Sequence, residues 1–173
     1  EADDRLFVSY YEGMTVYGES GNDEIWGSSG ADKLYGGDGD DTFIGEDGDD
    51  IMVGGKGNDF FEGRGGTDTV VFGRNTGTDI VSNSVDILKF EEGIRPEDFI
   101  VKFTGDGDIT ISVKDGDTQV VLDGFRKYES SRNYTLEFDD GTVMHASDEN
   151  SPLRIITGTE ADDRLFVSYY EGM

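Results

Sequence analysis

A nine-residue pattern occurs six times without interruption between Gly18 and Val71. Each block has glycine at positions one and four, aspartate at position six and a large apolar residue at position eight. The blocks read GESGNDEIW, GSSGADKLY, GGDGDDTFI, GEDGDDIMV, GGKGNDFFE and GRGGTDTVV. A short fixed period is the signature of a repeat architecture, in which each unit buries its apolar face only by stacking on its neighbours.

The physics of one block predicts a tight turn followed by a short strand. Glycine permits the backbone to turn sharply, and the three residues after the turn are β-formers whose middle side chain faces inward, as in Thr42-Phe43-Ile44. Two blocks then complete one circuit of a flattened parallel coil. A helix is excluded because the apolar residues do not recur at the 3.6-residue period. The sequence therefore predicts an all-β fold that begins with a parallel β-roll, with two inner stacks: Ile25, Phe43 and Phe61; and Leu34, Met52 and Val70.

The sixth-position aspartates follow the same geometry. Blocks two apart lie on one side of the coil, so the aspartates form two ladders: Asp23, Asp41 and Asp59; and Asp32, Asp50 and Asp68. Stacked carboxylates repel one another unless a cation lies between them. Flexible sites made only of oxygen ligands suit Ca²⁺ better than Mg²⁺ or Zn²⁺.

The repeated block resembles the G-G-x-G-x-D-x-U-x calcium-binding nonapeptide of RTX (haemolysin-type) proteins. The resemblance implies that each ion is held between turns two blocks apart, by sixth-position aspartates and by carbonyls of the first four turn positions. It implies about four Ca²⁺ ions, bridging Asp23/Asp41, Asp41/Asp59, Asp32/Asp50 and Asp50/Asp68. The turn residues implied as further ligands are Gly18, Ser20, Gly27, Ser29, Gly36, Gly37, Asp38, Gly39, Gly45, Glu46, Asp47, Gly48, Gly54, Gly55, Gly57, Gly63, Arg64 and Gly66.

The outer blocks depart from that pattern. Glu19, Ser28 and Arg64 occupy the place of the second glycine, so weaker sites are expected at the ends. After two extra residues a partial block places Asp79 at position six. Asp79 could close the Asp59 ladder with one more ion, or bind none; the sequence leaves both open. Upstream, Asp4 matches position six, whereas the stretch from Val8 to Tyr17 has no turn aspartate.

A duplication is the second informative feature. Residues 1–14, EADDRLFVSYYEGM, recur unchanged as residues 160–173. We expect a tandem array of near-identical modules, with an engineered overlap or permutation as the alternative. The expected organisation is a calcium-binding roll over residues 1–82, an antiparallel β-domain over 83–146, a linker over 147–159 and the start of the next repeat over 160–173.

The second half has a different pattern. β-alternation is expected over Val85–Phe90, Phe99–Phe103, Asp108–Val113, Gln119–Leu122 and Tyr134–Phe138. Short connections such as Asp115-Gly116-Asp117 favour antiparallel pairing, with Ile109, Ile111 and Val113 opposite Phe99, Val101 and Phe103. The segments FEEGIRPEDFIV, GDITISV and LEFDDGTVM resemble the haemolysin-type calcium-binding-protein-related domain, which accompanies RTX repeats in large secreted proteins.

Composition and missing motifs disfavour several classes of function. The chain has 39 acidic and 14 basic residues and a formal net charge of −25, which disfavours nucleic-acid binding and membrane insertion. It has no cysteine, and its single histidine is His145. A zinc-binding H-E-x-x-H helix is therefore impossible, and no G-x-S-x-G motif occurs. We expect no enzymatic activity.

These observations favour a calcium-binding structural repeat, an adhesin-like rod or spacer of a large bacterial RTX protein. Its partners would be adjacent copies of the same repeat. Since extracellular calcium modules work at 10⁻⁴ to 10⁻³ M, we expect a secreted protein, with or without cell-surface attachment, that folds on binding Ca²⁺. The RTX resemblance implies type I secretion. Two alternatives remain: a carbohydrate- or surface-binding module, with Phe125, Tyr128 and Tyr134 as candidate aromatics, and a secretion or folding device for a toxin or enzyme elsewhere in the chain.

Overall fold

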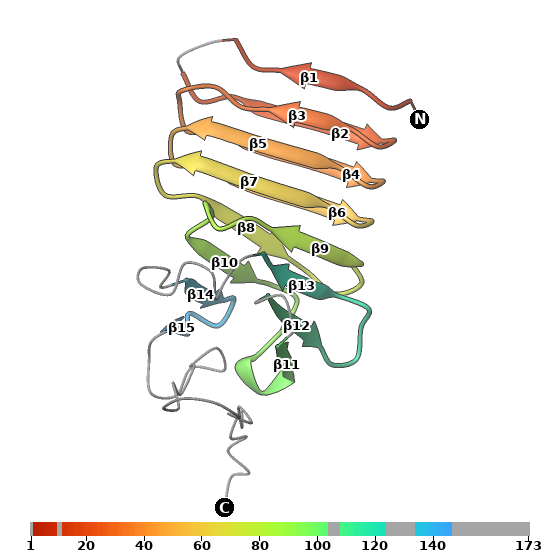
Figure 1. The fold of residues 1–173 in the computed structure, drawn as a ribbon, viewed down its shortest axis with the longest axis vertical. Helices are drawn as coiled ribbons and strands as arrows, with labels where there is room; N and C mark the ends of the chain where they lie inside the picture. The colour runs from red at the N-terminus through yellow and green to blue at the C-terminus, as the bar shows by residue number, and fades with distance from the viewer. Residues whose placement is uncertain (1, 10–11, 104–107, 124–133, 147–173) are drawn as a thin grey trace, which may run out of the picture.

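The computed structural model describes residues 2–9, 12–103, 108–123 and 134–146. These residues form two facing β-sheets, and the chain alternates between them (Figure 1). In spatial order, the eight-stranded sheet contains β1 (Arg5–Phe7), β3 (Glu24–Trp26), β5 (Thr42–Asp47), β7 (Phe60–Gly65), β9 (Thr78–Val81), β13 (Gln119–Leu122), β12 (Ile109–Val113) and β11 (Phe99–Phe103). The seven-stranded sheet contains β15 (Val143–His145), β14 (Thr135–Phe138), β10 (Ile87–Phe90), β8 (Thr69–Phe72), β6 (Ile51–Lys56), β4 (Lys33–Asp38) and β2 (Thr15–Ser20).

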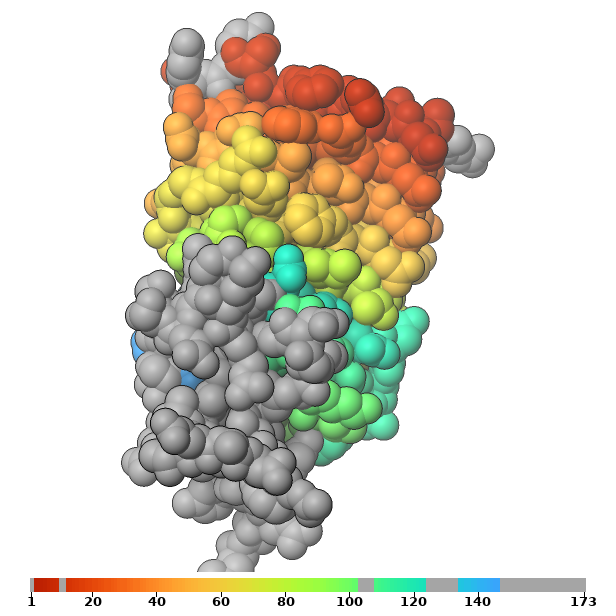
Figure 2. All heavy atoms as spheres, in the orientation of Figure 1, coloured from red at the N-terminus to blue at the C-terminus, as the bar shows by residue number. Residues whose placement is uncertain are grey.

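The first nine strands form the predicted parallel roll. Neighbours in each sheet are one circuit apart, so Phe43 pairs with Phe61 and Leu34 with Met52. The rings of Phe43 and Phe61 stack with centroids 4.9 Å apart. The two predicted inner stacks are confirmed, and all six of their residues are at most 1% exposed. In the space-filling view the circuits follow one another as layers along the long axis (Figure 2).

The second half contains antiparallel strands, as predicted, but three of its strands pair in parallel with the roll or with its extension. β11 pairs with β12 and β12 with β13 in antiparallel fashion, in the expected register of Phe99 with Val113. However, β10, β13 and β14 join the sheets of the roll in parallel. Leu88 of β10 and Leu136 of β14 extend the stack that ends in Val70. Continuing that stack buries both leucines completely, which local turn signals could not reveal.

One hydrophobic core serves both halves. A single cluster of buried residues runs from Ile25 in the roll to Ala146 after β15. Within the described residues, no gap in the core marks the expected boundary after residue 82, and antiparallel pairing starts only after β10, with β11 and β12. The domain limits remain predictions. The expected linker at 147–159 and the repeated segment at 160–173 lie outside the described residues. In the part of the chain that is described, no helix has the length and apolarity needed to cross a bilayer.

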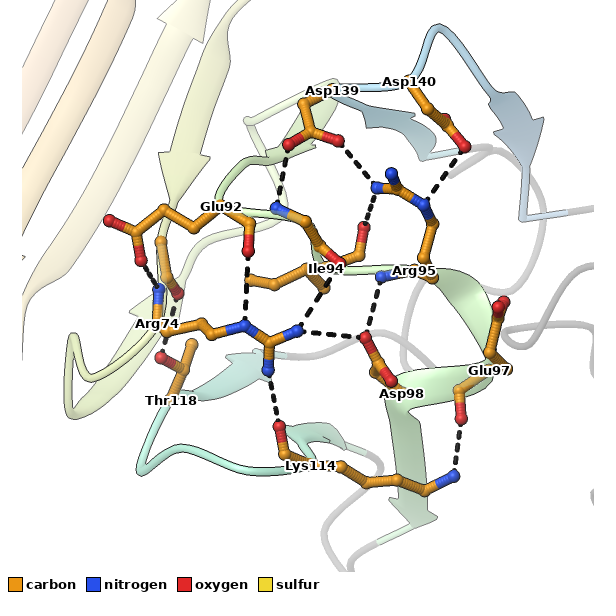
Figure 3. Close-up of polar contacts among 12 residues, drawn as sticks. Arg74, Glu92, Ile94, Arg95, Glu97, Asp98, Lys114, Thr118, Asp139 and Asp140 are labelled. Atoms are coloured by element: carbon orange, nitrogen blue, oxygen red, sulfur yellow. Dashed lines mark hydrogen bonds and ion pairs between the residues drawn. The ribbon is translucent and has the colours of Figure 1, made fainter.

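A polar cluster ties the last circuit of the roll to the antiparallel strands (Figure 3). The Arg74 guanidinium donates to the carbonyls of Glu92 and Lys114, at 3.3 and 2.8 Å, and pairs with Asp98 at 3.2 Å. Asp98 belongs to a short 3-10 helix, Pro96–Asp98, the one helical element among the described residues. Nearby, Arg95 pairs with Asp139 at 2.6 Å and with Asp140 at 3.2 Å. One arginine at the base of the roll thus holds three segments together.

Candidate metal centre

The sixth-position aspartates are buried at the turn that precedes each strand. Every one of them, and Asp79, is at most 2% exposed: Asp23, Asp32, Asp41, Asp50, Asp59, Asp68 and Asp79. Carboxylates are almost never buried so completely unless they are paired or bind a metal ion. These aspartates therefore have a role that a solvated turn would not explain.

One oxygen of each carboxylate accepts a hydrogen bond from a backbone N–H of the neighbouring circuit. The backbone N–H of Asp23 donates to Oδ1 of Asp41 at 2.8 Å, and the N–H of Asp41 donates to Oδ1 of Asp59 at 2.8 Å. On the other side of the roll, the N–H groups of Asp32 and Asp50 donate to Oδ1 of Asp50 and Asp68, at 2.8 and 3.1 Å. The structure thus brings each predicted ladder together at its predicted offset of 18 residues.

The other oxygen is left without a donor in most of the ladder. Oδ2 is buried and has no hydrogen-bond partner in five residues: Asp23, Asp41, Asp50, Asp59 and Asp68. A buried, unpaired charge costs several kcal/mol, and a single orphaned polar atom costs about 1–3 kcal/mol. Five at equivalent positions form a regular set that a bound cation would satisfy.

A backbone carbonyl lies beside these oxygens. A Cβ atom added to Gly36 would lie 2.1 Å from Oδ2 of Asp41 and 2.8 Å from the carbonyl oxygen of Gly54, one circuit further on. Gly18 and Gly45 have the same surroundings, with the carbonyls of Gly36 and Gly63 each at 2.8 Å. The first glycine of the block thus leaves open the place where a carboxylate oxygen and a carbonyl oxygen converge.

The glycine at position four is needed for close stacking of the circuits. Gly39 has φ +145°, and a Cβ there would lie 1.9 Å from the carbonyl oxygen of Gly21 in the previous circuit. Position two also has positive φ in every block except that of Ser28, even where it is not glycine: Glu19, Glu46 and Arg64 have φ of 75°, 72° and 85°. These three substitutions therefore preserve the turn despite the strain of that conformation in non-glycine residues.

Burial also alters the protonation of the ladder. Desolvation raises the pKa of Asp50 and of Asp59 to about 7, against the ordinary 3.8. It raises the pKa of Asp68 and of Asp79 to about 6, and it also raises the pKa of Asp41. The backbone hydrogen bonds to these carboxylates act in the opposite direction but are the smaller effect. Nearby positive charge would lower the pKa values again.

The donor set fits calcium. At Asp23, Asp41 and Asp50 the orphaned carboxylate oxygen has a backbone carbonyl beside it, and among the described residues there is no cluster of three or more His, Cys, Asp or Glu side chains able to hold a metal ion. Most ligands would have to be carbonyl oxygens, which Ca²⁺ accepts in flexible six- to eight-fold coordination. Asp23, Asp41, Asp50, Asp59 and Asp68 would hold the ion, and the carbonyls of Gly36, Gly54 and Gly63 would support it.

Several predicted ligands have side chains that point elsewhere. Asp38 and Asp47 are exposed, and Asp38 pairs with Lys56 at 3.2 Å. Glu46 pairs with Arg64 at 2.6 Å on the surface. These residues could contribute only backbone carbonyls.

Asp79 differs from the other ladder members. It accepts the N–H of Asp59 at Oδ1, but its Oδ2 accepts the hydroxyl of Thr76 at 3.1 Å.

Sequence reasoning missed the lower end of the second ladder. Asp86 accepts the backbone N–H of Asp68 at 3.0 Å, 18 residues on, and so takes the next place after Asp68. The signal was present: Asp86 stands two residues before the buried Leu88, the spacing of positions six and eight. The glycine pattern that marked the other blocks is absent there. At the upper end, Asp4 donates to Oδ1 of Asp23, which puts it at the start of its ladder, as its sequence position suggested.

A second, exposed ladder at position five was also missed. Oδ1 of Asn22 accepts the N–H of Asp40 at 2.9 Å, and Oδ1 of Asp40 accepts the N–H of Asn58 at 2.7 Å. These side chains reinforce the stacking of turns at the surface, so asparagine serves there as well as aspartate.

The comparison with protein-family models agrees with a calcium-binding role for these turns. Residues 15–43 and 44–79 match the model of the RTX calcium-binding nonapeptide repeat (4 copies). No curated protein matches the chain. Among solved structures, the chain is similar to the solution structure of the AlgE6R3 subunit from the Azotobacter vinelandii mannuronan C5-epimerase. The identity is 20%, the match covers 96% of this chain and 92% of that one, and the TM-score is 0.47. At those values the similarity says nothing about activity.

Proposed function

This chain is an RTX repeat protein, with calcium-binding nonapeptide repeats over residues 15–79, and we propose that it is a structural module that folds when it binds extracellular Ca²⁺. The observation that carries the proposal is the set of five buried Oδ2 atoms without a donor. Without a cation, every circuit of the roll would bury an uncompensated carboxylate. With one, the same groups join successive circuits.

Charge supports coupling of folding to metal binding. Between Gly18 and Val71 there are 14 acidic and 3 basic residues, and each strand buries one main apolar side chain. The free energy gained by that burial is small compared with the conformational entropy cost of ordering nine residues per block. Metal binding and folding of the roll would then be a single event. Calcium levels outside the cell suit such sites, which supports a secreted or surface-attached protein.

The proposed role is a spacer built of identical modules. At a strand spacing of about 4.8 Å, the eight-stranded sheet extends about 35 Å from its first strand to its last. The unchanged recurrence of residues 1–14 at 160–173 supports an array in which each copy adds a similar length. Adjacent copies of the repeat would be the main partners, as in an adhesin-like rod. Enzymatic activity is not part of the proposal, because the buried aspartates are committed to the fold and to calcium.

A carbohydrate- or surface-binding role is the second candidate, and one observation favours it. The rings of Tyr17 and Tyr35 stack with centroids 5.0 Å apart, and Tyr17 is 64% exposed. Flat exposed aromatic pairs can accept a sugar ring. Of the aromatics named from the sequence for this role, Tyr134 is buried in the core, and Phe125 and Tyr128 lie outside the described residues. Loss of polysaccharide binding in Tyr17→Ala, with the fold unchanged, would support this second role.

Circular dichroism during a titration of calcium-free protein with Ca²⁺, with Mg²⁺ as the control, tests the main proposal. We expect a largely disordered spectrum to become β-rich at submillimolar to millimolar Ca²⁺ and not at equal Mg²⁺. A full β spectrum in excess chelator would mean that folding does not need the metal. No response to Ca²⁺ by any measure would rule out the calcium role itself.

A further inference from the structure

The turn that contains Ser28 satisfies its carboxylate differently from the turns of the five aspartates whose Oδ2 has no donor. Oδ2 of Asp32 accepts the backbone N–H of Ser28 at 2.6 Å and the Ser28 hydroxyl at 3.0 Å. Asp32 is 1% exposed, yet it is absent from the set of buried oxygens without a donor. Ser28 therefore supplies hydrogen-bond donors to Oδ2 from within its own turn, whereas the turns of the five donor-free aspartates supply none.

The backbone of this turn is also different. Position two has positive φ in the turns that contain Glu19, Gly37, Glu46, Gly55 and Arg64, whereas Ser28 does not. At position four, Gly30 lacks the positive φ that Gly21, Gly39, Gly48, Gly57 and Gly66 share. The changed dihedrals turn the Ser28 N–H toward Asp32. A backbone donor then points at the place where the other turns offer oxygen.

A hydroxyl has the same effect at the lower end of the other ladder. Thr76 lies in the turn that is two residues longer than the rest, and its hydroxyl reaches Oδ2 of Asp79. The same hydroxyl lies 3.2 Å from that of Thr118, and the Thr118 hydroxyl donates to the carbonyl of Gly73. Thr118 immediately precedes β13, in which Val120 is the strand partner of Asp79. Neutral hydroxyls thus replace the charged ladder as the roll ends.

We propose that Ser28 and Thr76 take the place of calcium at Asp32 and Asp79, so that this module binds five Ca²⁺ ions, one for each carboxylate whose Oδ2 has no donor. The proposal rests on the calcium-binding function proposed above and specifies which turns perform it. N–H and O–H donors aimed at a carboxylate oxygen both satisfy that oxygen and repel a cation. The set differs from the one implied by family resemblance, which pairs Asp32 with Asp50.

The physical consequence is that the roll has metal-free ends on opposite sides. Asp32 opens the run of aspartates in its ladder, since the equivalent position one circuit earlier is Met14, whose N–H donates to Oδ1 of Asp32 at 2.6 Å. A calcium ion there would lack a second acidic turn above it. In the next strand of the sheet Val120 pairs with Asp79, so an ion there would lack a ladder carboxylate below it. The hydroxyls of Ser28 and Thr76 therefore satisfy Oδ2 at the two positions where a calcium ion could not lie between ladder carboxylates on both sides.

Native mass spectrometry of the calcium-loaded intact chain tests the count. We expect five ions in the wild type and six in Ser28→Gly, because the second glycine restores the turn found in the neighbouring blocks. Thr67→Gly is the control: it places a glycine in another turn of the roll, at an exposed side chain outside the expected ligand set, and it should keep five. Any other wild-type count, or five ions in a Ser28→Gly protein with a wild-type circular dichroism spectrum, would overturn the inference.

A second pair of variants keeps the test decisive if Ser28→Gly does not fold. Asp50→Asn should reduce the count below five, whereas Asp32→Asn should leave it at five; a reduced count in Asp32→Asn would contradict the proposal. Complete absence of calcium from the wild type would instead refute the function on which the inference rests, so the two failures are distinguishable.

Discussion

Asp41 donates its backbone N–H to Oδ1 of Asp59 at 2.8 Å, while Oδ2 of Asp59 is buried and meets no donor. In each of the five aspartates whose Oδ2 has no donor, one oxygen thus accepts a backbone N–H of the preceding circuit and the other is available to a cation. The two roles can be separated by asparagine, which retains an acceptor but loses the charge.

Asp41→Asn should have opposite effects with and without metal. The amide oxygen can still accept the N–H of Asp23, but a calcium ligand is lost, so the Ca²⁺ midpoint of folding should rise about tenfold or more, within the range seen when groups around a metal are altered. In chelator the variant should be more ordered than the wild type, because a buried unpaired charge is gone. Calcium titration followed by circular dichroism measures both.

Asp40→Asn is the control for that variant. Asp40 is exposed and its Oδ1 accepts the N–H of Asn58, which asparagine can also do. The same change of charge should shift the midpoint little. Equal shifts in the two variants would show that net charge, and not the buried ladder, governs folding.

Gly36→Ala should remove one calcium site by filling it. The new Cβ would lie 2.1 Å from Oδ2 of Asp41, so the carboxylate must move, at a cost of about 1–3 kcal/mol for overpacking. Isothermal calorimetry should show one ion fewer. Gly116→Ala is the comparison, since its Cβ would meet nothing closer than 3.6 Å, and it should bind calcium like the wild type.

Acidity should stabilise the calcium-free roll and weaken calcium binding. Burial raises the pKa of Asp50 and Asp59 to about 7 from the ordinary 3.8, so the folded chain binds more protons than the unfolded chain between about pH 4 and 7. Stability in chelator is then greatest below about pH 4 and falls as the pH rises to 7. Calcium requires the deprotonated carboxylates, so its affinity should increase over the same range.

The β content in chelator and the Ca²⁺ midpoint of folding, each measured by circular dichroism across this pH range, check the two opposed trends, in stability and in calcium affinity. A β content or a midpoint that does not fall as the pH rises would contradict the assignment of these carboxylates as the coupled groups. Asp41→Asn should flatten both trends.

Arg74→Ala should destabilise the junction between the roll and the antiparallel strands. Its guanidinium is mostly buried and binds the carbonyls of Glu92 and Lys114 and the carboxylate of Asp98, so a loss of about 2–4 kcal/mol in the free energy of unfolding is expected. Arg5→Ala removes a single ion pair from a side chain that is 75% exposed, and should cost less than about 1 kcal/mol. Urea unfolding with Ca²⁺ present compares them.

The roll could be predicted from sequence because every circuit repeats the same local chemistry. Glycine, aspartate and an apolar residue recur at fixed spacing, so the register of Phe43 with Phe61 follows from the period alone. Where the nine-residue period stops, the residues of a short segment no longer indicate which strand it pairs with. The segment Ile87–Phe90 reads as any short strand, and only the stack of Val70, Leu88 and Leu136 shows that it continues the roll.

The same limit applied to the metal site. The repeat pattern predicted which carboxylates are stacked, but it could not distinguish Glu19, Ser28 and Arg64, which all replace the second glycine. Two of these adopt positive φ and preserve the turn, while Ser28 does not. The difference lies in backbone dihedrals and in one hydrogen-bond donor, neither of which follows from residue type alone.

The nearly constant offset between paired turns also has a kinetic meaning. Contacts between neighbouring circuits of the repeated blocks join residues 18 apart, and the two ends of the roll differ little: Asp4 meets Asp23 at 19 and Asp59 meets Asp79 at 20. Loop-closure entropy depends only weakly on length, so adding any circuit to a growing roll has nearly the same entropic cost. Such a chain assembles as a one-dimensional series of equal steps, and its rate of growth would be set by how quickly each new turn captures its ion.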